Sequence, residues 1–556
     1  MESSFAGRPL ASYTLALSHA LSGRAPWGYH ALGVLLHAAN AVLLLALLRG
    51  TLGRGALGAR LGDAAPRLAF AGAALWALHP LLSEAVVFTS ARSELLFSLF
   101  LLLALLAALR GFESGARSAA WSTLAVVAVA LGTLCKEVMV VAPVAVLLYD
   151  RSFLAGGFAP ALRRRPGLYL GLAASWLVVA AVVLSQPRGK TVGVDLGLTP
   201  IQYLFTQASV LLHYLRLAVW PAPLQFLYDW PPAFTLREAL PELAVTSGLA
   251  LATLALLWRR PVAAFPPAWF FLVLAPTSSV VPIVSELVAE KRMYLPLAGL
   301  VPGAVVALHL AGRALGEATG RRGVVRPLEG LVLAALATAL GLATWERVGV
   351  WQSERSLWED TAARAPLHPW VNNNLGIVYL RAGELERAEE RFRAALARRP
   401  ELATAWVNLG NVRMARGDVA GAVEAYRRGL EERPDAYEVH YNLGLGLARL
   451  GEVEAAVAHW EEAVRLYPGH RSAHVGLARA YARRGELARA LEHQRLVIAL
   501  NPAEAAAHVD LAEWLLEAGD VSAAVAAYRS ALAVEGGNLR ARVGLAGAEA
   551  LQRERP

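Results

Sequence analysis

The chain has 556 residues, of which 56% are hydrophobic and 17% are charged, and it carries a formal net charge of +9. Apolar runs broken by short arginine-rich loops fill the part up to about Glu346, whereas the part from Trp351 onward is polar and rich in Ala, Glu and Arg. This contrast excludes a single soluble domain and indicates a membrane domain followed by a soluble one. The single cysteine, Cys135, excludes an internal disulfide framework and a cysteine-based zinc site.

Composition and motifs exclude further classes. Most of the positive charge sits in loops between apolar segments, where membrane topology explains it, so it does not indicate nucleic-acid binding. No GxSxG, P-loop or Rossmann fingerprint is present, which leaves hydrolase, ATPase and dehydrogenase functions without support. The basic residues are nearly all arginine, and together with the abundant alanine this bias favours a bacterial origin.

The apolar segments predict a helical bundle that crosses the membrane. A spanning helix needs about 20 mainly apolar residues. Ten segments are predicted to span: 30–48, 68–88, 94–110, 119–135, 138–150, 168–185, 239–258, 262–284, 294–312 and 327–346. An eleventh, 201–220, carries Gln202, Gln207, His213 and Arg216, which favour an amphipathic or re-entrant helix over a lipid-facing span.

The distribution of arginine predicts the orientation of these spans. Loops 49–67, 110–118, 150–167, 259–260 and 313–326 hold 4, 2, 4, 2 and 4 arginines. Assigning all five to the cytoplasm satisfies the positive-inside tendency, provided that 201–220 stays on the outer face. We therefore expect domain 1–349 in the inner (plasma) membrane and domain 350–556 on the periplasmic or extracellular side.

Ionisable residues interrupt the apolar pattern on the predicted outer face. Near bilayer depth each charge costs about 2.5–3.5 kcal/mol on insertion scales. The stretch "LHPLLSEAVVFTSARSELLFS" (78–98) nevertheless contains His79, Glu84, Arg92 and Glu94. The predicted topology brings three more polar stretches to the same face: "CKE" (135–137), the loop 186–238 and "SELVAEKR" (285–292). Acidic and basic groups gathered on one side of a bundle predict an outward-facing site embedded in the membrane.

The N-terminal 29 residues raise a question of topology. They would also begin on the outer face, yet they contain no basic n-region, no continuous h-region and no cleavage site. We therefore expect a spanning helix upstream that the sequence as given does not include.

From residue 350 onward a unit of 34 residues repeats. Small residues recur at Gly376, Gly410, Gly444, Ala478, Ala512 and Ala546, turn glycines at Gly383, Gly417, Gly451, Gly485 and Gly519, and closing prolines at Pro366, Pro400, Pro434, Pro468 and Pro502. This is the tetratricopeptide repeat pattern, in which small residues let paired helices approach closely and proline ends the second helix. Five full repeats with partial ends predict an α-solenoid whose groove binds a protein or peptide segment. A scaffold with no specific ligand in the groove is the alternative.

Several motifs carry a resemblance that covers nearly the whole chain. They are "RPLASYTLALSHALSGRAPWGYHALGVLLHAANAVLL", "LHPLLSEAVVFTSARSELL", "LCKEVMVVAPVAVLLYD", "LLHYLRLAVWPAPLQFLYDWP" and "VAEKRMYLPLAGL", followed by the repeats. Because these motifs occur in this order, the chain resembles the transmembrane and tetratricopeptide repeat-containing O-mannosyltransferases and their bacterial relatives. The resemblance implies an all-α, GT-C-like polytopic bundle followed by the solenoid. It also implies transfer of a mannose-like sugar from a polyprenyl-phosphate donor to a protein hydroxyl.

The expected chemistry selects candidate residues. A hydroxyl acceptor needs a carboxylate base, and the leaving lipid phosphate needs cationic or metal stabilisation. The candidate catalytic carboxylates are Glu84, Glu94, Glu137 and Asp229. The candidate substrate-binding residues are His79, Arg92, Lys136, Lys291, Arg292 and Tyr294. A divalent metal would also serve the phosphate, but no set of metal ligands is defined.

The sequence departs from the family at its beginning. Family members carry an acidic pair in the first external loop, which should lie just before "GRPL" (7–10), where this chain starts. Three explanations stay open: a misplaced or truncated start, an inactive copy, or another carboxylate in the role of base.

The candidate residues also have structural interpretations. These are a helix cap at His79–Pro80, an ion pair of Glu84 with Arg92 or Lys136, an external turn anchored by Arg92 and Glu94, dipole compensation by Lys136 and Glu137, a turn at Asp229, and a solvated run at 290–292. Two other functions stay open. One is a non-catalytic membrane scaffold whose repeats bind envelope proteins, and the other is a transferase acting on a lipid-linked glycan or wall polymer.

Overall fold

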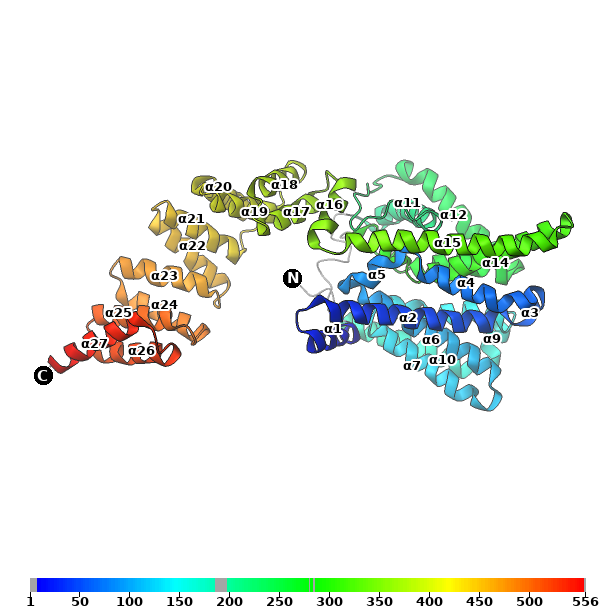
Figure 1. The fold of residues 1–556 in the computed structure, drawn as a ribbon, viewed down its shortest axis with the longest axis horizontal. Coiled ribbons are helices and arrows are strands. Elements are labelled where there is room, and N and C mark those ends of the chain that lie inside the picture. Colours follow the sequence, from blue (N-terminus) through cyan, green and yellow to red (C-terminus); the bar gives the residue numbers. More distant parts are fainter. Residues whose placement is uncertain (1–7, 186–197, 280, 284–285, 555–556) are drawn as a thin grey trace. The chain divides into compact units, whose positions relative to one another are not determined.

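The protein is all-α, which confirms the predicted fold class. The computed structural model describes residues 8–185, 198–279, 281–283 and 286–554, and within these ranges it contains helices and no strands (Figure 1). The chain divides into two compact units, Met1–Arg364 and Ala365–Pro556. Residues 186–197 of the predicted loop 186–238, and the end of the predicted span 262–284, lie outside the described residues.

The first unit consists of helices joined by short turns. Its α-helices are α1 (Pro9–Ser22), α2 (Pro26–Leu52), α3 (Gly55–Leu61), α4 (Ala65–Ala77), α5 (Ser83–Val87), α6 (Arg92–Glu113), α7 (Ser118–Thr133), α8 (Ala142–Phe153), α9 (Phe158–Arg164), α10 (Pro166–Ser185), α11 (Pro200–Val219), α12 (Leu236–Arg259), α13 (Pro261–Leu274), α14 (Leu297–Ala318), α15 (Arg322–Val350) and α16 (Glu354–Arg364). Three 3-10 turns matter below: η2 (Pro80–Leu82), η5 (Glu137–Val141) and η7 (Glu290–Met293).

Each of the ten predicted spans overlaps a helix, although not all of these helices are long and the described part of the span 262–284 is helical only as far as Leu274. Among the described residues five helices are long and apolar enough to cross a membrane, and they correspond to α2, α6, α12, α14 and α15. Two bent pairs would raise the number to seven: Gly55–Ala77 with Pro80–Val87, bent by 54°, and Glu137–Phe153 with Phe158–Arg164, bent by 108°. The remaining three predicted spans fall on the shorter apolar helices α7, α10 and α13. Ten crossings therefore stay a prediction.

The first unit, Met1–Arg364, is the membrane unit, and helix α6 lies at its centre. Its sequence "LLFSLFLLLALLAAL" is apolar on every side, as expected for a helix surrounded by other helices. It packs against α2 and α7, and α4 packs against α2 and α14 (Figure 1). A Cβ atom at Gly72 would lie 3.0 Å from the Pro302 side chain, so glycine there allows α4 and α14 to approach closely.

The arginine-rich connections gather at one end of the bundle. Arg54 and Arg110 both pair with Glu113, and the pair of Arg54 with Glu113 joins the arginine-rich loop 49–67 to the loop 110–118. Arg313 donates a hydrogen bond to the Arg60 carbonyl, and Arg60 and Arg260 line the same cavity. In Figure 1, α3 and α9 lie at this end, whereas α1 and α5 lie at the opposite end. The bundle therefore has one arginine-rich end, as expected for a positive-inside topology.

The second unit is built from pairs of helices. Its helices are α17 (Pro369–Arg381), α18 (Leu385–Arg398), α19 (Ala403–Ala415), α20 (Val419–Glu432), α21 (Tyr437–Arg449), α22 (Val453–Leu466), α23 (Arg471–Arg483), α24 (Leu487–Leu500), α25 (Ala505–Glu517), α26 (Val521–Val534) and α27 (Leu539–Glu554). The turn glycines of the five repeats adopt φ angles between 74° and 87°, a region that favours glycine. A Cβ atom at Gly410 would lie 2.5 Å from the Tyr426 ring, which explains the small residue at this position.

In each of two consecutive repeats, a histidine pair joins the two helices of that repeat, α21 with α22 and α23 with α24. Nδ1 of His440 lies 3.0 Å from Nδ1 of His459, and its Nε2 lies 3.0 Å from the Pro434 carbonyl oxygen. Since Nε2 must carry the proton to donate to that carbonyl, Nδ1 of neutral His440 accepts a hydrogen bond from His459. His474 and His493 repeat this arrangement at 2.9 Å. If both rings of a pair were protonated, two N–H donors would face each other.

We predict that acid destabilises the repeats through these pairs. Burial, and then the neighbouring His440, lowers the pKa of His459 below its ordinary value, and Arg427 opposes its charge while Glu462 favours it. A depressed histidine pKa means that the unfolded chain binds the proton first, near its ordinary value of about 6.5. The stabilisation is therefore present above that pH and is lost as the pH falls through and below it.

The measurement is the unfolding temperature of the unit Ala365–Pro556 by circular dichroism between pH 7.5 and 5. The double variant His459→Gln/His493→Gln should lose most of the pH dependence that the unmodified unit shows. An identical pH profile in both proteins would contradict this role of the pairs.

Candidate functional site

Helix α11, the predicted amphipathic helix, holds the segment 286–293 in place through its polar side chains. The Gln207 amide donates a hydrogen bond to the Leu287 carbonyl at 3.0 Å. The Tyr214 hydroxyl donates to the Ala289 carbonyl at 3.1 Å and accepts from its N–H at 2.9 Å. Backbone groups of an irregular segment inside an apolar bundle need such partners. Gln207 and Tyr214 of α11 are therefore explained by contacts inside the unit.

Lys291, in η7, bridges two carboxylates. Its backbone N–H donates to Glu84 Oε2 at 2.9 Å, and its Nζ lies 3.6 Å from Glu84 Oε1 and 2.7 Å from Glu286 Oε1. Glu84 lies in the first turn of α5 and is buried. The irregular segment thus brings a cation to a carboxylate that comes from a region more than 200 residues away in the chain.

A second buried ion pair lies close to the first. Glu94, in the first turn of α6, pairs closely with Lys136, which directly precedes η5. The charge of Lys136 acts on Glu286, and the charge of Glu94 acts on Lys291. These side chains therefore form one lysine–glutamate cluster, which consists of Glu84, Glu94, Lys136, Glu286 and Lys291.

Ionisation within the cluster follows from these neighbours. Burial opposes the charge of Glu286, but Lys291 and Arg292 outweigh it and lower the pKa of this carboxyl. Burial likewise opposes the charge of Lys291, whereas Glu84 and Glu286 raise its pKa. The lowered pKa of Glu286 and the raised pKa of Lys291 thus both favour the charged form of the group. The Glu286 side chain is 39% exposed and that of Glu84 only 2%, so Glu286 forms the accessible edge of the cluster.

Glu290 and Arg347 form an adjoining buried group. Glu290 Oε1 accepts hydrogen bonds from the Tyr228 hydroxyl at 2.7 Å and from the Gln225 N–H, and its Oε2 lies 3.6 Å from Arg347. Arg347 also lies 3.3 Å from Asp360. Burial raises the pKa of Glu290 to about 7 despite the nearby arginine. The segment 286–293 thus contributes charges to two neighbouring networks.

Arg92 and His79 engage backbone groups in the structure. Nη1 of Arg92 donates to the Thr14 carbonyl at 2.9 Å, and its Nη2 donates to the Tyr29 carbonyl at 2.9 Å, so the guanidinium ties α6 to α1 and α2. Nδ1 of His79 accepts from the N–H of Leu81 in η2, and its Nε2 lies 3.2 Å from the carbonyl of Ala218 in α11. These contacts match the structural interpretations, and binding of substrate by either residue stays a prediction.

Of the other predicted residues, Arg292 lies beside the cluster, whereas Tyr294, Glu137 and Asp229 have other surroundings. Arg292 is buried and donates to the Glu286 carbonyl at 2.7 Å, beside the cluster. Tyr294 is only 1% exposed, and its hydroxyl lies 2.8 Å from Nδ1 of His37. Glu137 pairs with Arg8 at 3.1 Å. Asp229 is exposed, and within the described part of the chain no partner for its carboxylate is found. The structure therefore brings together Glu84, Glu94, Lys136, Lys291 and Arg292, but not Asp229.

Sequence reasoning missed Glu286 as a member of the cluster, and it missed Glu290 and Arg347 beside it. The signal available was the polar stretch "SELVAEKR" between two apolar segments. Its one lysine and its one arginine, Lys291 and Arg292, were selected as phosphate ligands, but the acidic residues of the same stretch were not. Within the described ranges, no group of three or more His, Cys, Asp or Glu side chains lies close enough together to hold a metal ion.

Both units of the chain are similar in sequence to known proteins. The tetratricopeptide repeat family model matches residues 373–437 and 441–505. Protein O-mannosyl-transferase TMTC4 of Mus musculus is 25% identical over 427 residues, covering 66% of this chain and 55% of the relative. The TMTC4 protein of Homo sapiens is 25% identical over 422 residues with the same coverage. TMTC3 of Mus musculus is 35% identical over 132 residues, covering 23% of this chain and 13% of the relative. The chain spans about half the length of the TMTC4 relatives.

Solved structures match the repeat pattern over about a third of the chain. YrrB, described as a tetratricopeptide repeat protein with an unusual peptide-binding site, has a TM-score of 0.31 and 20% identity, covering 34% of this chain and 96% of that chain. The MamA protein has a TM-score of 0.29 and 21% identity, covering 30% of this chain and 92% of that chain.

The fold and the cluster define a class: a helical membrane protein with buried charges in its bundle, followed by a tetratricopeptide solenoid. The repeat unit makes up about a third of the chain, so similarity over 66% of the chain must extend into the membrane unit. The chain is a homologue of the protein O-mannosyl-transferases TMTC4, TMTC3 and TMTC2, and this similarity supports a TMTC-like family.

We predict that Lys136→Met destabilises the membrane unit by about 3–5 kcal/mol, because it leaves the Glu94 carboxylate buried without its partner. The double variant Glu94→Gln/Lys136→Met should recover most of this loss, since it removes both charges. The measurement is a double-mutant cycle of thermal unfolding in detergent. Equal stability of Lys136→Met and the unmodified protein would show that the pair does not hold the bundle together.

Proposed function

We propose that this chain is a membrane glycosyltransferase that transfers mannose to protein hydroxyl groups. The observation that carries the proposal is the similarity to proteins named O-mannosyl-transferase, which extends beyond the repeats into the membrane unit. The donor we propose is a polyprenyl-phosphate-linked sugar. The buried cluster of lysines and glutamates supports the proposal, because charges are expensive in an apolar bundle and mark functional sites there.

We further propose that the site faces the outer side of the plasma membrane. Arginine-rich connections gather at the end of the bundle that carries α3 and α9, and the positive-inside tendency would place that end in the cytoplasm. The lysine–glutamate cluster, which includes Glu84 of α5, belongs to the opposite end. A lipid-linked donor whose sugar lies at the outer surface would meet the cluster there.

In the proposed reaction, the oxygen of a Ser or Thr side chain attacks the anomeric carbon of the donor. The bond between that carbon and the phosphate oxygen breaks, a carboxylate takes the hydroxyl proton, and the polyprenyl phosphate leaves with the bonding electrons. The proposed role of Lys291 is to stabilise this phosphate, and Lys136 and Arg292 lie close to it. Glu286 is the carboxylate with the most accessible side chain in the cluster, and Glu84, Glu94, Glu137 and Asp229 stay alternative bases.

The repeats are proposed to position the acceptor. Asparagines recur at equivalent positions in the first helices of three repeats: Asn374, Asn408 and Asn442. The Asn408 amide donates to Asn373 at 3.2 Å, and the Asn442 amide donates to Asn411 at 3.4 Å. Side-chain amides both donate and accept, so a row of them can bond the backbone of an extended peptide. A protein segment is therefore the proposed occupant of the groove.

A non-catalytic membrane scaffold is the second candidate, and one observation favours it. The predicted catalytic carboxylates Glu84 and Glu94 both pair with lysines inside the bundle, as structural ion pairs would. Under this interpretation the repeats bind envelope proteins and no sugar is transferred. A transferase acting on a lipid-linked glycan would use the same cluster with another acceptor.

Variants of the ion pair Glu84–Lys291 distinguish the transferase function from the scaffold function. We predict that Lys291→Met lowers mannose transfer by about a hundredfold, the typical effect of removing a group that stabilises the developing charge. The measurement is transfer from polyprenyl-phosphate mannose to a Ser- and Thr-containing peptide by the protein in liposomes. Arg237→Gln, at an exposed site in α12, is the matched control and should keep full transfer.

A folding defect must be excluded, because Lys291→Met leaves Glu84 unpaired. The double variant Glu84→Gln/Lys291→Met removes both charges and should restore thermal stability without restoring transfer. If the double variant transfers mannose as fast as the unmodified protein, the pair is structural and the cluster is not the proposed site.

We predict that Asn408→Ala/Asn442→Ala raises the KM for the peptide acceptor about tenfold and leaves kcat nearly unchanged, because only acceptor binding loses hydrogen bonds. Gln552→Ala, at an exposed position in α27, serves as the control. A fall in kcat at unchanged KM would contradict a role of these asparagines in acceptor binding.

A further inference from the structure

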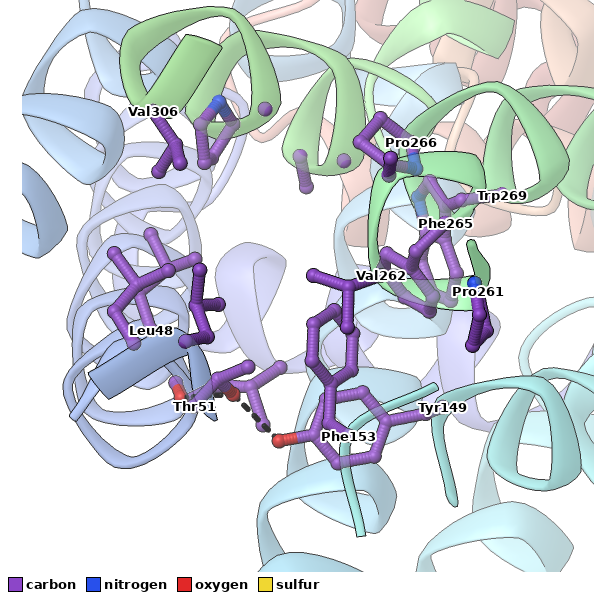
Figure 2. Close-up of a pocket in the computed structure, with 18 of the residues that line it drawn as sticks. Leu48, Thr51, Tyr149, Phe153, Pro261, Val262, Phe265, Pro266, Trp269 and Val306 are labelled. Atoms are coloured by element: carbon purple, nitrogen blue, oxygen red, sulfur yellow. Dashed lines mark hydrogen bonds between the residues drawn. The ribbon is translucent and has the colours of Figure 1, made fainter. Parts of the chain in front are cut away.

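A second feature of the membrane unit is a cavity of about 650 Å³ at its arginine-rich end, separate from the lysine–glutamate cluster. Its volume lies within the range of small-molecule binding pockets. Figure 2 shows side chains from α2, α8, α13 and α14 around an open centre. Its walls are mainly apolar, and the labelled lining residues are Leu48, Thr51, Tyr149, Phe153, Pro261, Val262, Phe265, Pro266, Trp269 and Val306.

The polar groups inside the cavity are already satisfied. Thr51 donates to the Leu47 carbonyl at 2.7 Å, and its oxygen is hydrogen-bonded to the Tyr149 hydroxyl (Figure 2). Since Thr51 uses its proton for Leu47, Tyr149 is the donor in this second bond. The interior therefore offers contacts to hydrocarbon and few unused hydrogen bonds, which favours an aliphatic occupant.

Two arginines give the cavity a charged rim. Arg60, in α3, and Arg260, directly before α13, line it and are exposed. Across the described part of the chain neither guanidinium forms an ion pair or a side-chain hydrogen bond. By contrast Arg54, in the same connection as Arg60, is paired with Glu113. Two uncompensated positive charges beside an apolar cavity complement a molecule with an anionic head and hydrocarbon chains.

We propose that this cavity binds an anionic glycerophospholipid of the surrounding bilayer, with its phosphate on Arg60 and Arg260 and an acyl chain inside. The cavity lies at the end of the bundle that also carries the other arginine-rich connections, away from the cluster proposed to meet the donor. A structural lipid at this end would fill a void that otherwise leaves the wall side chains without packing partners. The proposal does not depend on transferase activity.

The test compares two lipids that differ only in the headgroup. The delipidated full chain in detergent is titrated with palmitoyl-oleoyl phosphatidylglycerol or with the corresponding phosphatidylcholine. Binding is followed by native mass spectrometry and by the unfolding temperature. Phosphatidylglycerol should bind at least tenfold more tightly and raise the unfolding temperature, because only it keeps a net negative charge at the rim.

Two variants locate the site and one controls for charge. Arg60→Gln/Arg260→Gln should abolish the preference for phosphatidylglycerol. Ala307→Phe should weaken the binding of both lipids, because Ala307 lines the cavity and the ring would fill it. Arg163→Gln/Arg321→Gln removes the same charge from exposed arginines outside the cavity and should leave the preference intact.

Three outcomes would overturn the proposal. Equal affinity for the two lipids would remove the role of the rim, and an unchanged preference in Arg60→Gln/Arg260→Gln would place phosphatidylglycerol elsewhere. Polyprenyl phosphate that displaces phosphatidylglycerol and binds more tightly through the same arginines would make the cavity a site for the donor tail. If the unmodified protein transfers no mannose, the proposed function fails but this proposal does not, because lipid binding is measured directly.

Discussion

The neutralisation of buried charge is the constraint on which the membrane unit depends. An ionised side chain inside an apolar bundle is stable only beside an opposite charge or several polar backbone groups. Lys291 meets Glu84 and Glu286, Lys136 meets Glu94, and each pair joins segments far apart in the chain. The charged residues are therefore also the points at which α5, α6, η5 and η7 are fixed to one another. Side chains held in this way keep a fixed position, as the proposed transferase site requires.

Much of the fold is predictable because it depends on local periodicity. Each span predicted from apolar length overlaps a helix, and each turn glycine predicted from the 34-residue repeat has a positive φ. The site is less predictable, because ion pairing depends on which segments meet in space. Arg92 appears available in the sequence, yet its donors are used by backbone carbonyls of α1 and α2. Glu286 appears to be a loop residue, yet α11 holds its segment against the bundle.

The two ends of the membrane unit have different chemistry. One end holds the lysine–glutamate cluster, in which opposite charges alternate and only the edge at Glu286 is accessible. The other end holds an apolar cavity with Arg60 and Arg260 at its rim. The first arrangement fits a site that stabilises charge during a reaction, and the second fits a lipid that is bound for packing and position. This division explains why one bundle contains both buried ion pairs and an open apolar cavity.

The most direct test of the account is to determine which end of the bundle faces the outside of the cell. A donor presented at the outer surface can reach the cluster only if the cluster faces that side. The measurement is labelling of Asp229→Cys by a membrane-impermeant maleimide in intact cells. It uses a Cys135→Ser background to remove the buried native thiol, and Arg321→Cys serves as the comparison on the arginine-rich end. The account predicts that Asp229→Cys is labelled without permeabilisation and Arg321→Cys only after it. The reverse pattern would place the cluster on the cytoplasmic side and contradict the proposed outward-facing site.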